Sequence, residues 1–155
     1  MTQSIKLTSD QLGLLSAFQR ITHITAYDCI DDTERDRIIF VVNNKDLGLA
    51  IGKGGVTIKK LIHSIKRNVE LVEYNKSPEI FIKNILGSKY VHKVVVNERL
   101  DGSMQAIATV DAQNKGLVVG MEGRHIKKAR LMAARHFGIN HIAIDTSLDI
   151  MEDEE

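Results

Sequence analysis

Two glycine-rich tetrads in the sequence have the residue types of a phosphate-binding turn: Gly52-Lys53-Gly54-Gly55 and Gly120-Met121-Glu122-Gly123. Glycine reaches backbone angles that other residues avoid, and because it has no side chain, main-chain amides can approach a ligand closely. Where a helix begins at such a turn, its first amide groups and the positive end of its dipole favour an anion. The tetrads therefore predict two phosphate-binding turns, each directly before a helix.

The tetrads belong to a longer internal repeat. Gly48-Leu49-Ala50-Ile51-Gly52 recurs as Gly116-Leu117-Val118-Val119-Gly120, and Ile58-Lys59-Lys60 recurs as Ile126-Lys127-Lys128. All matched positions are 68 residues apart, as positions 52 and 120, or 58 and 126, show. A fixed offset over this many positions indicates a duplicated structural unit.

The first turn lies in a basic stretch. Residues 47–69 contain five lysines and arginines and no acidic residue, although the whole chain has 21 basic and 20 acidic residues. Because binding follows local fields rather than net charge, we expect Lys53, Lys59 and Lys60 to contact a nucleic-acid backbone. The apolar residues expected to contact the bases are Ile51, Val56 and Ile58.

The second turn carries a carboxylate, Glu122, where a phosphate would pass, and like charges disfavour that contact. The basic residues Arg124, Lys127 and Lys128 follow it closely. Two readings stay open: Glu122 points away from the ligand, or the second unit binds weakly and mainly supports the first. In either case we expect the first turn to dominate binding.

Caps and turn formers place matching elements in the two halves of the chain. Thr8-Ser9-Asp10-Gln11 has the form of a capping box and predicts a helix that reaches Thr22. Ser77-Pro78 predicts the start of the corresponding helix in the second half, and Gly87 is placed to end it. The charged residues 31–36 are expected to form an exposed hairpin loop.

The other expected elements complete the same order, helix–strand–strand–helix–turn–helix–strand, in each half. In the first half they are strands at 25–30 and 37–42, helices at 45–51 and 56–66, and a strand at 69–74. In the second half they are strands at 90–100 and 104–110, a short helix before Gly120, a helix at 124–136 and a strand at 142–144. We therefore expect domains at residues 1–75 and 76–147, followed by an acidic tail at 148–155.

The first turn and its flanks resemble a known signature. Ile51-Gly52-Lys53-Gly54-Gly55 followed by Ile58-Lys59-Lys60 resembles the I-G-x-x-G motif of KH domains, whose loop clamps about four nucleotides of backbone. The helix and strand that precede this core resemble the prokaryotic, or type II, KH arrangement. The resemblance implies an α+β fold, sandwich-like, with two tandem type II KH domains, each a three-stranded mixed sheet packed on three helices.

Two such domains in a short chain, with residues 38–42 before residues 46–52, resemble the archaeal form of the NusA family of transcription elongation and termination factors. This resemblance implies single-stranded RNA as the partner, with RNA polymerase as a further one. An open alternative is a KH-domain subunit of a ribosome-associated or RNA-processing complex. The residues expected to bind RNA are Ile51, Gly52, Lys53, Gly54, Gly55, Ile58, Lys59, Lys60, Gly120, Gly123, Arg124, Lys127 and Lys128.

The composition argues against several other classes of protein. Aromatic residues make up only 5% of the chain and tryptophan is absent, which disfavours the stacking platforms of RRM and OB domains. The single cysteine excludes a cysteine-rich zinc site. No apolar stretch approaches the roughly 18 residues of a membrane span, and no signal peptide is recognisable. We expect a cytoplasmic monomer without metal or cofactor.

An enzyme is the remaining alternative, because Lys53-Gly54-Gly55-Val56-Thr57 superficially resembles a variant phosphate-binding loop. A working P-loop ends in Gly-Lys-Ser/Thr, with the lysine on the phosphates and the hydroxyl on magnesium. Here Val56 precedes Thr57, and the repeat has Arg124-His125 at these positions. The sequence therefore predicts a binding protein and no catalysis.

Overall fold

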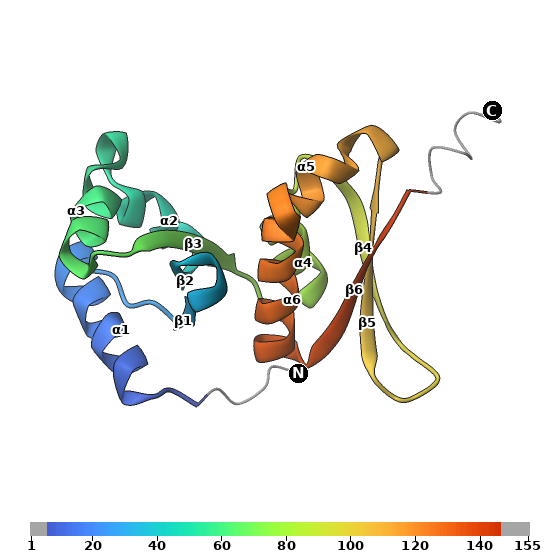
Figure 1. Cartoon of the computed structure of the whole chain (residues 1–155), viewed down its shortest axis with the longest axis horizontal. Coiled ribbons are helices and arrows are strands. Elements are labelled where there is room, and N and C mark those ends of the chain that lie inside the picture. The colour runs from blue at the N-terminus through green and yellow to red at the C-terminus, as the bar shows by residue number, and fades with distance from the viewer. Residues whose placement is uncertain (1–5, 147–155) are drawn as a thin grey trace. The chain divides into compact units, whose positions relative to one another are not determined.

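The structure, a computed structural model, describes residues 6–146. Within them the backbone forms two compact units, Lys6–Asn75 and the residues from Lys76 onward (Figure 1). The acidic tail predicted at 148–155 lies outside the described residues, as do residues 1–5. The expected α+β class is confirmed, since each unit combines helices with a three-stranded mixed sheet.

The first unit has its sheet in the order β1-β2-β3, with the central strand β2 antiparallel to β1 and parallel to β3. The capping box is confirmed, because Thr8 and Gln11 exchange side-chain and backbone hydrogen bonds at the start of the first helix. The elements of this unit are α1 (Ser9–Thr22), β1 (Asp28–Asp32), β2 (Arg37–Asn43), α2 (Asn44–Ile51), α3 (Val56–Ile65) and β3 (Asn68–Tyr74).

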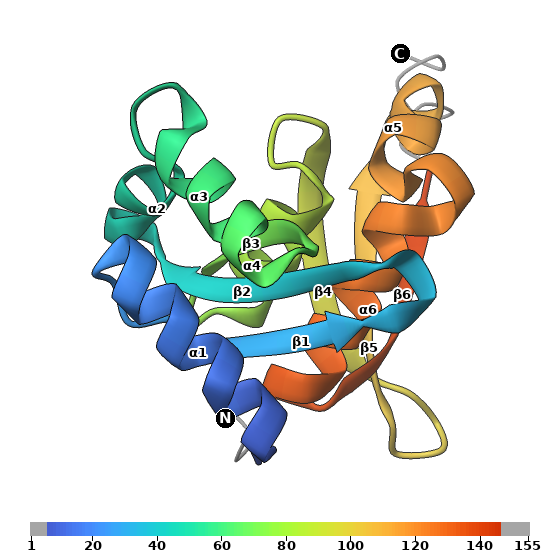
Figure 2. The same ribbon diagram turned by 60° about the vertical axis from the view of Figure 1, so that its left-hand side comes forward.

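The core of the first unit lies between one face of this sheet and the helices α1 and α3, which lie side by side in Figure 2. Phe18 of α1 stacks on Phe40 of β2, with 4.5 Å between the ring centroids. Leu61 of α3 and Ala50 of α2 are buried in the same cluster. These contacts fix the two helices that flank the first glycine turn.

The second unit repeats this architecture, with its sheet in the order β4-β5-β6 and the same strand directions. Its first helix begins as expected, with the Ser77 hydroxyl accepting a hydrogen bond from the Ile80 amide, and it ends at Gly87. The elements are α4 (Pro78–Leu86), β4 (Val91–Glu98), β5 (Met104–Val110), α5 (Lys115–Val119), α6 (Arg124–Phe137) and β6 (Ile139–Asp145). Helices α4 and α6 cover one face of the sheet (Figure 1).

The first strand differs from its prediction at 25–30, since β1 runs from Asp28 to Asp32. Asp31 and Asp32 pair with Ile38 and Arg37 of β2, so the expected hairpin loop is shorter than residues 31–36. The physical reason is a fully buried cation. Arg37 donates to Asp32 in β1 at 2.8 Å and to both carboxylate oxygens of Glu70 in β3 at 3.1 Å, and it therefore links all three strands.

Two strands of the second unit also differ in extent from their predictions. The strand expected at 90–100 is β4, which ends at Glu98. The last strand was expected at 142–144 but begins at Ile139, because Ile139 pairs with Met104 across the parallel ladder. Long-range pairing of this kind leaves no local mark in the sequence.

Candidate nucleic-acid interface

The first turn joins α2 to α3 through three glycines with positive φ. Gly52, Gly54 and Gly55 have φ angles of 77°, 63° and 77°, which residues with a Cβ atom rarely adopt. The amide of Gly55 donates to the carbonyl of Gly52 at 3.0 Å and closes the turn. Gly55 is also the N-cap of α3, and no side chain caps that end of the helix. The start of α3 therefore faces the turn.

The backbone of α3 lies so close to the first residue of this turn that only glycine fits there. A Cβ atom built at Gly52 would lie 2.8 Å from the amide nitrogen of Thr57, a distance that real Cβ atoms do not show. At Gly54, no atom of the described chain lies within 4 Å of such a Cβ. Gly52 is thus required by both packing and backbone angle, whereas Gly54 is required by its backbone angle alone.

The second turn has the same backbone. Gly120, Glu122 and Gly123 have φ angles of 81°, 56° and 75°, and the Gly123 amide donates to the Gly120 carbonyl at 3.0 Å. A Cβ atom at Gly120 would lie 3.0 Å from the amide nitrogen of His125, the residue that matches Thr57 in the repeat. The difference is Glu122, which holds a left-handed conformation despite its side chain, at a cost of about 1–2 kcal/mol.

Three exposed lysines surround the first turn: Lys53, Lys59 and Lys60. Within residues 6–146, no salt bridge engages any of them. The side chain of Lys59 folds back over the turn, with its Cε 3.9 Å from the position of a Cβ atom at Gly55. The start of a helix and several cations thus share one accessible surface.

Arg67, at the end of the basic stretch, is engaged elsewhere. Its guanidinium contacts Asp31 at 2.8 Å and Asp36 at 2.9 Å. The hydrogen bond to Asp31 is the main cause that raises the pKa of Arg67 above its ordinary value. The two carboxylates offset its charge, so Arg67 contributes less positive charge to the surface than the lysines beside the turn do.

The second turn is less uniformly basic. Arg124 and Lys127 are exposed, and the Lys127 Cε lies 3.5 Å from the position of a Cβ atom at Gly123. Glu122 is exposed as well. Lys128 is only 9% exposed, unlike its repeat partner Lys60, because it lies on the buried side of α6. The structure therefore does not place Lys128 on the surface of Arg124 and Lys127.

Exposed apolar side chains lie beside both turns. Ile51 and Val56 are 39% and 48% exposed, and Ile58 is half-buried, so these three apolar side chains are at least partly accessible at the first turn. Sequence reasoning missed Leu49 and its repeat partner Leu117, which are 68% and 57% exposed. The repeat already indicated these two positions, because both copies have a leucine there.

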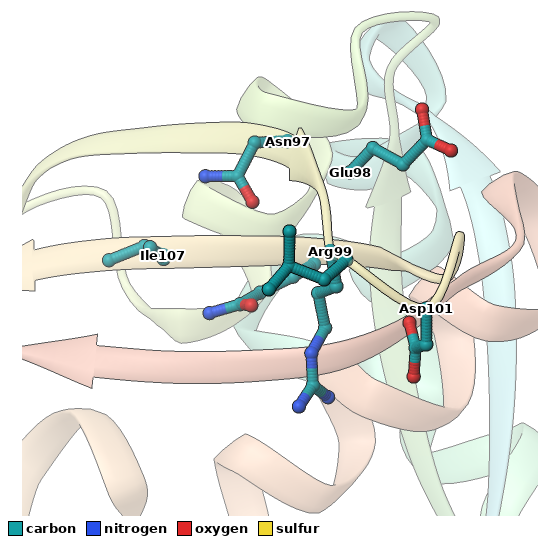
Figure 3. Close-up of a pocket in the computed structure, with 7 residues that line it drawn as sticks. Asn97, Glu98, Arg99, Asp101 and Ile107 are labelled. Atoms are coloured by element: carbon teal, nitrogen blue, oxygen red, sulfur yellow. The ribbon is translucent and has the colours of Figure 1, made fainter.

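A separate pocket lies at the turn between β4 and β5 (Figure 3). Its volume is about 560 Å³, and it contains no residue of either glycine turn. The hydroxyl and the amide of Ser103 donate to Asp101 in its wall and lower the pKa of that carboxyl. The lining residues are Asn97, Glu98, Arg99, Leu100, Asp101, Gln105 and Ile107.

Among residues 6–146 there is no group of three or more histidine, cysteine, aspartate or glutamate side chains that could hold a metal ion. No helix in this range is long and apolar enough to cross a membrane. Cys29 is buried, as a small core residue would be.

The first unit matches the sequence profile of a known domain family. The sequence profile of the KH domain matches residues 16–86, a segment that starts within α1 and includes the first glycine turn, β3 and α4.

Relatives cover nearly the whole chain. A protein of Halobacterium salinarum named probable transcription termination protein NusA is 36% identical over 141 residues, which cover 91% of this chain and 99% of that protein. A protein of Methanococcus vannielii with the same name is 29% identical and covers 93% and 82%. The crystal structure of APE1850 superposes with a TM-score of 0.83 at 37% identity, covering 90% of this chain and all of that one.

The geometry of the first turn predicts unequal costs for two alanine substitutions. Gly52→Ala should destabilise the protein by about 3 kcal/mol, because it adds a clash with the Thr57 amide to an unfavourable φ. Gly54→Ala should cost about 1 kcal/mol, because only the φ is unfavourable. Urea unfolding of both variants measures the difference. Equal losses would contradict the close approach at Gly52.

Proposed function

The chain belongs to the archaeal NusA family, and from this premise we propose that it binds single-stranded RNA during transcription elongation and termination, clamping the RNA backbone at its GxxG turns. The observation that carries the proposal is the first turn itself. Its positive-φ glycines open the main chain to a ligand at the start of α3, and three exposed lysines beside it have no salt-bridge partner among residues 6–146.

Each part of the first turn has a role in this proposal. A phosphate lies over Gly54 and Gly55, where the open backbone and the dipole of α3 stabilise negative charge. Lys53 and Lys59 neutralise the phosphates on either side, and Lys60 extends the positive surface along α3. The bases face Ile51 and Val56, whose exposed aliphatic side chains offer apolar contact in place of aromatic stacking.

The second unit is proposed as a second type II KH domain at residues 76–147, with the first at 1–75. Support comes from its sheet order, which matches that of the first unit, and from the shared backbone of the two turns. We propose that it binds RNA more weakly. Glu122 puts a carboxylate beside the phosphate path, and the burial of Lys128 removes one of the cations that the first turn offers.

The clamp is tested by Lys53→Asp combined with Gly54→Asp. The pair should lower RNA affinity at least tenfold, because it lowers the formal net charge by three and opposes the phosphates directly. Fluorescence anisotropy with a labelled single-stranded oligonucleotide measures the loss. For the original chain, log affinity should fall with log salt at a slope of about −2 to −3, as expected for three or four phosphates.

The matched control is Arg99→Asp combined with Leu100→Asp, which changes the net charge equally at the exposed β4–β5 turn. This control should keep most of the affinity. An equal loss of RNA affinity in both double variants would contradict a clamp at the first turn. RNA binding by the original chain that does not depend on salt concentration would contradict it as well.

Reversing the charge of Glu122 tests whether the second turn contacts RNA. Glu122→Lys should tighten binding about 3- to 10-fold, because an attraction replaces a repulsion near the phosphates. Lysine and glutamate share the cost of the left-handed conformation, so the substitution does not change that cost. Glu98→Lys, also exposed, gives the same charge change outside the turns and should have little effect. If Glu122→Lys does not increase RNA affinity, the second turn does not contact RNA.

The role in transcription is tested by crosslinking the tagged full chain in its native cells. We expect RNA polymerase subunits and nascent transcripts to co-purify with it. Recovery of ribosomal subunits or nucleases in their place would instead support a KH subunit of a ribosome-associated or RNA-processing complex. Sequencing of the crosslinked RNA would then define the bound sites.

A further inference from the structure

One face of the sheet in the second unit is open to solvent. Helices α4 and α6 cover the opposite face (Figure 1), where Val94, Ala106 and Ile142 are buried. Side chains alternate between the two faces of a strand, so the residues between these point outward. Val95 of β4 is 45% exposed, and Ala143 of β6 is exposed as well. Apolar side chains thus reach solvent on the open face.

Strand pairing arranges the outward residues of this face in three rows. The middle row is apolar and consists of Val95, Ile107 and Ala143. The row toward the end of β6 has a cation on one edge strand, Lys93 of β4, and a carboxylate on the other, Asp145 of β6. Two strand spacings, or about 10 Å, separate these edges. The open face therefore carries opposite charges on its two sides.

The third row lies at the other end of the face and is polar. It consists of Asn97, Gln105 and His141. Asn97 and Gln105, together with Ile107, line the pocket at the β4–β5 turn (Figure 3), whereas His141 is exposed on β6. A hollow over β4 and β5 and an exposed ring on β6 thus lie in the same row.

A second copy of the chain complements this face when it is rotated by a half turn about an axis along β5. The rotation places β4 of each copy over β6 of the other, as in two aligned sheets packed face to face. Lys93 then faces Asp145 of the second copy at both edges, and each His141 ring faces the hollow at Asn97. A half turn about an axis across the strands places Lys93 over Asn97 and leaves the charges unpaired. Charge complementarity therefore selects the first arrangement.

We propose that the open face of the β4-β5-β6 sheet pairs two copies of this chain, with the middle rows packed on each other. The face spans three strands about 4.8 Å apart and the seven residues of β5 at about 3.3 Å each, or about 300 Å² per copy. A standard interface buries about 800 Å² per partner. The association is therefore weak, with a dissociation constant of about 0.1–1 mM, and the monomer expected from the sequence is the form in dilute solution.

A weak contact of this kind gains effect when two chains lie on one RNA, a consequence that rests on the proposed function. Tethering to the same strand raises the effective concentration of one copy near the other to the millimolar range, which matches the strength of the interface. The three rows contain no residue of either glycine turn. The pairing surface and the proposed clamp are thus distinct, and an RNA long enough for two chains should bind them cooperatively.

The test is charge reversal in the full chain without RNA. Sedimentation equilibrium should show monomers of the original chain at about 10 µM and mostly dimers at about 1 mM. Lys93→Glu should weaken the dimer about tenfold, because both charge pairs become repulsive, and Asp145→Lys should do the same. An equimolar mixture of the two variants should associate as strongly as the original chain, since opposite charges meet again at both edges.

Lys45→Glu provides the matched control, because Lys45 is exposed on α2 of the first unit and its reversal changes the net charge equally. This variant should dimerise like the original chain. Circular dichroism checks that every variant is folded. If Asp145→Lys does not fold, the salt dependence of the original dimer takes its place, and association should weaken between about 0.05 and 1 M salt.

The outcomes separate the pairing from the clamp. An original chain that stays monomeric at about 1 mM overturns the pairing, as does an equal loss in Lys45→Glu and Lys93→Glu. A mixture that does not recover, or association that does not depend on salt, overturns it too. A dimer that Lys93→Glu weakens and the mixture restores supports the pairing even if the chain does not bind RNA, in which case only the proposed function fails.

Discussion

The close approach between the first glycine of each turn and the first residues of the next helix is the constraint on which the interface depends. At Gly52 and at Gly120 there is no room for a side chain, because the side chain and the amide of Thr57 or of His125 occupy the space. This contact sets the direction in which α3 and α6 leave the turn. Within each unit, the start of the helix and the lysine one turn further along therefore lie beside the turn.

The sheet and its core hold this contact in place. Leu61 of α3 and Ala50 of α2 are buried in the same cluster, so the two helices that flank the first turn cannot separate without opening the core. The buried Arg37 joins β1, β2 and β3 through Asp32 and Glu70. Breaking one partner of such a buried ion pair is costly. The turn can therefore stay open and exposed on a rigid support.

The two glycine turns share their backbone geometry but differ in charge. The backbone angles of the turns agree closely, even though Glu122 replaces Gly54 and carries the strain of a left-handed conformation. The charges differ, since the first turn has three exposed lysines and the second combines exposed cations with a carboxylate. Preserved geometry with altered charge is consistent with the proposed difference in RNA affinity between the two turns.

The sequence by itself determined the duplication, the class of fold and the position of both turns. These features are local: Thr8 and Gln11 form a cap within one helix turn, and the repeat offset needs no tertiary contact. The tertiary structure decided what depends on distant residues. It extended β1 to Asp32 through the pairing with Arg37, began β6 at Ile139 opposite Met104, and buried Lys128 while exposing Lys60. The sequence could not show these features, because strand pairing and burial are set by residues that lie far apart along the chain.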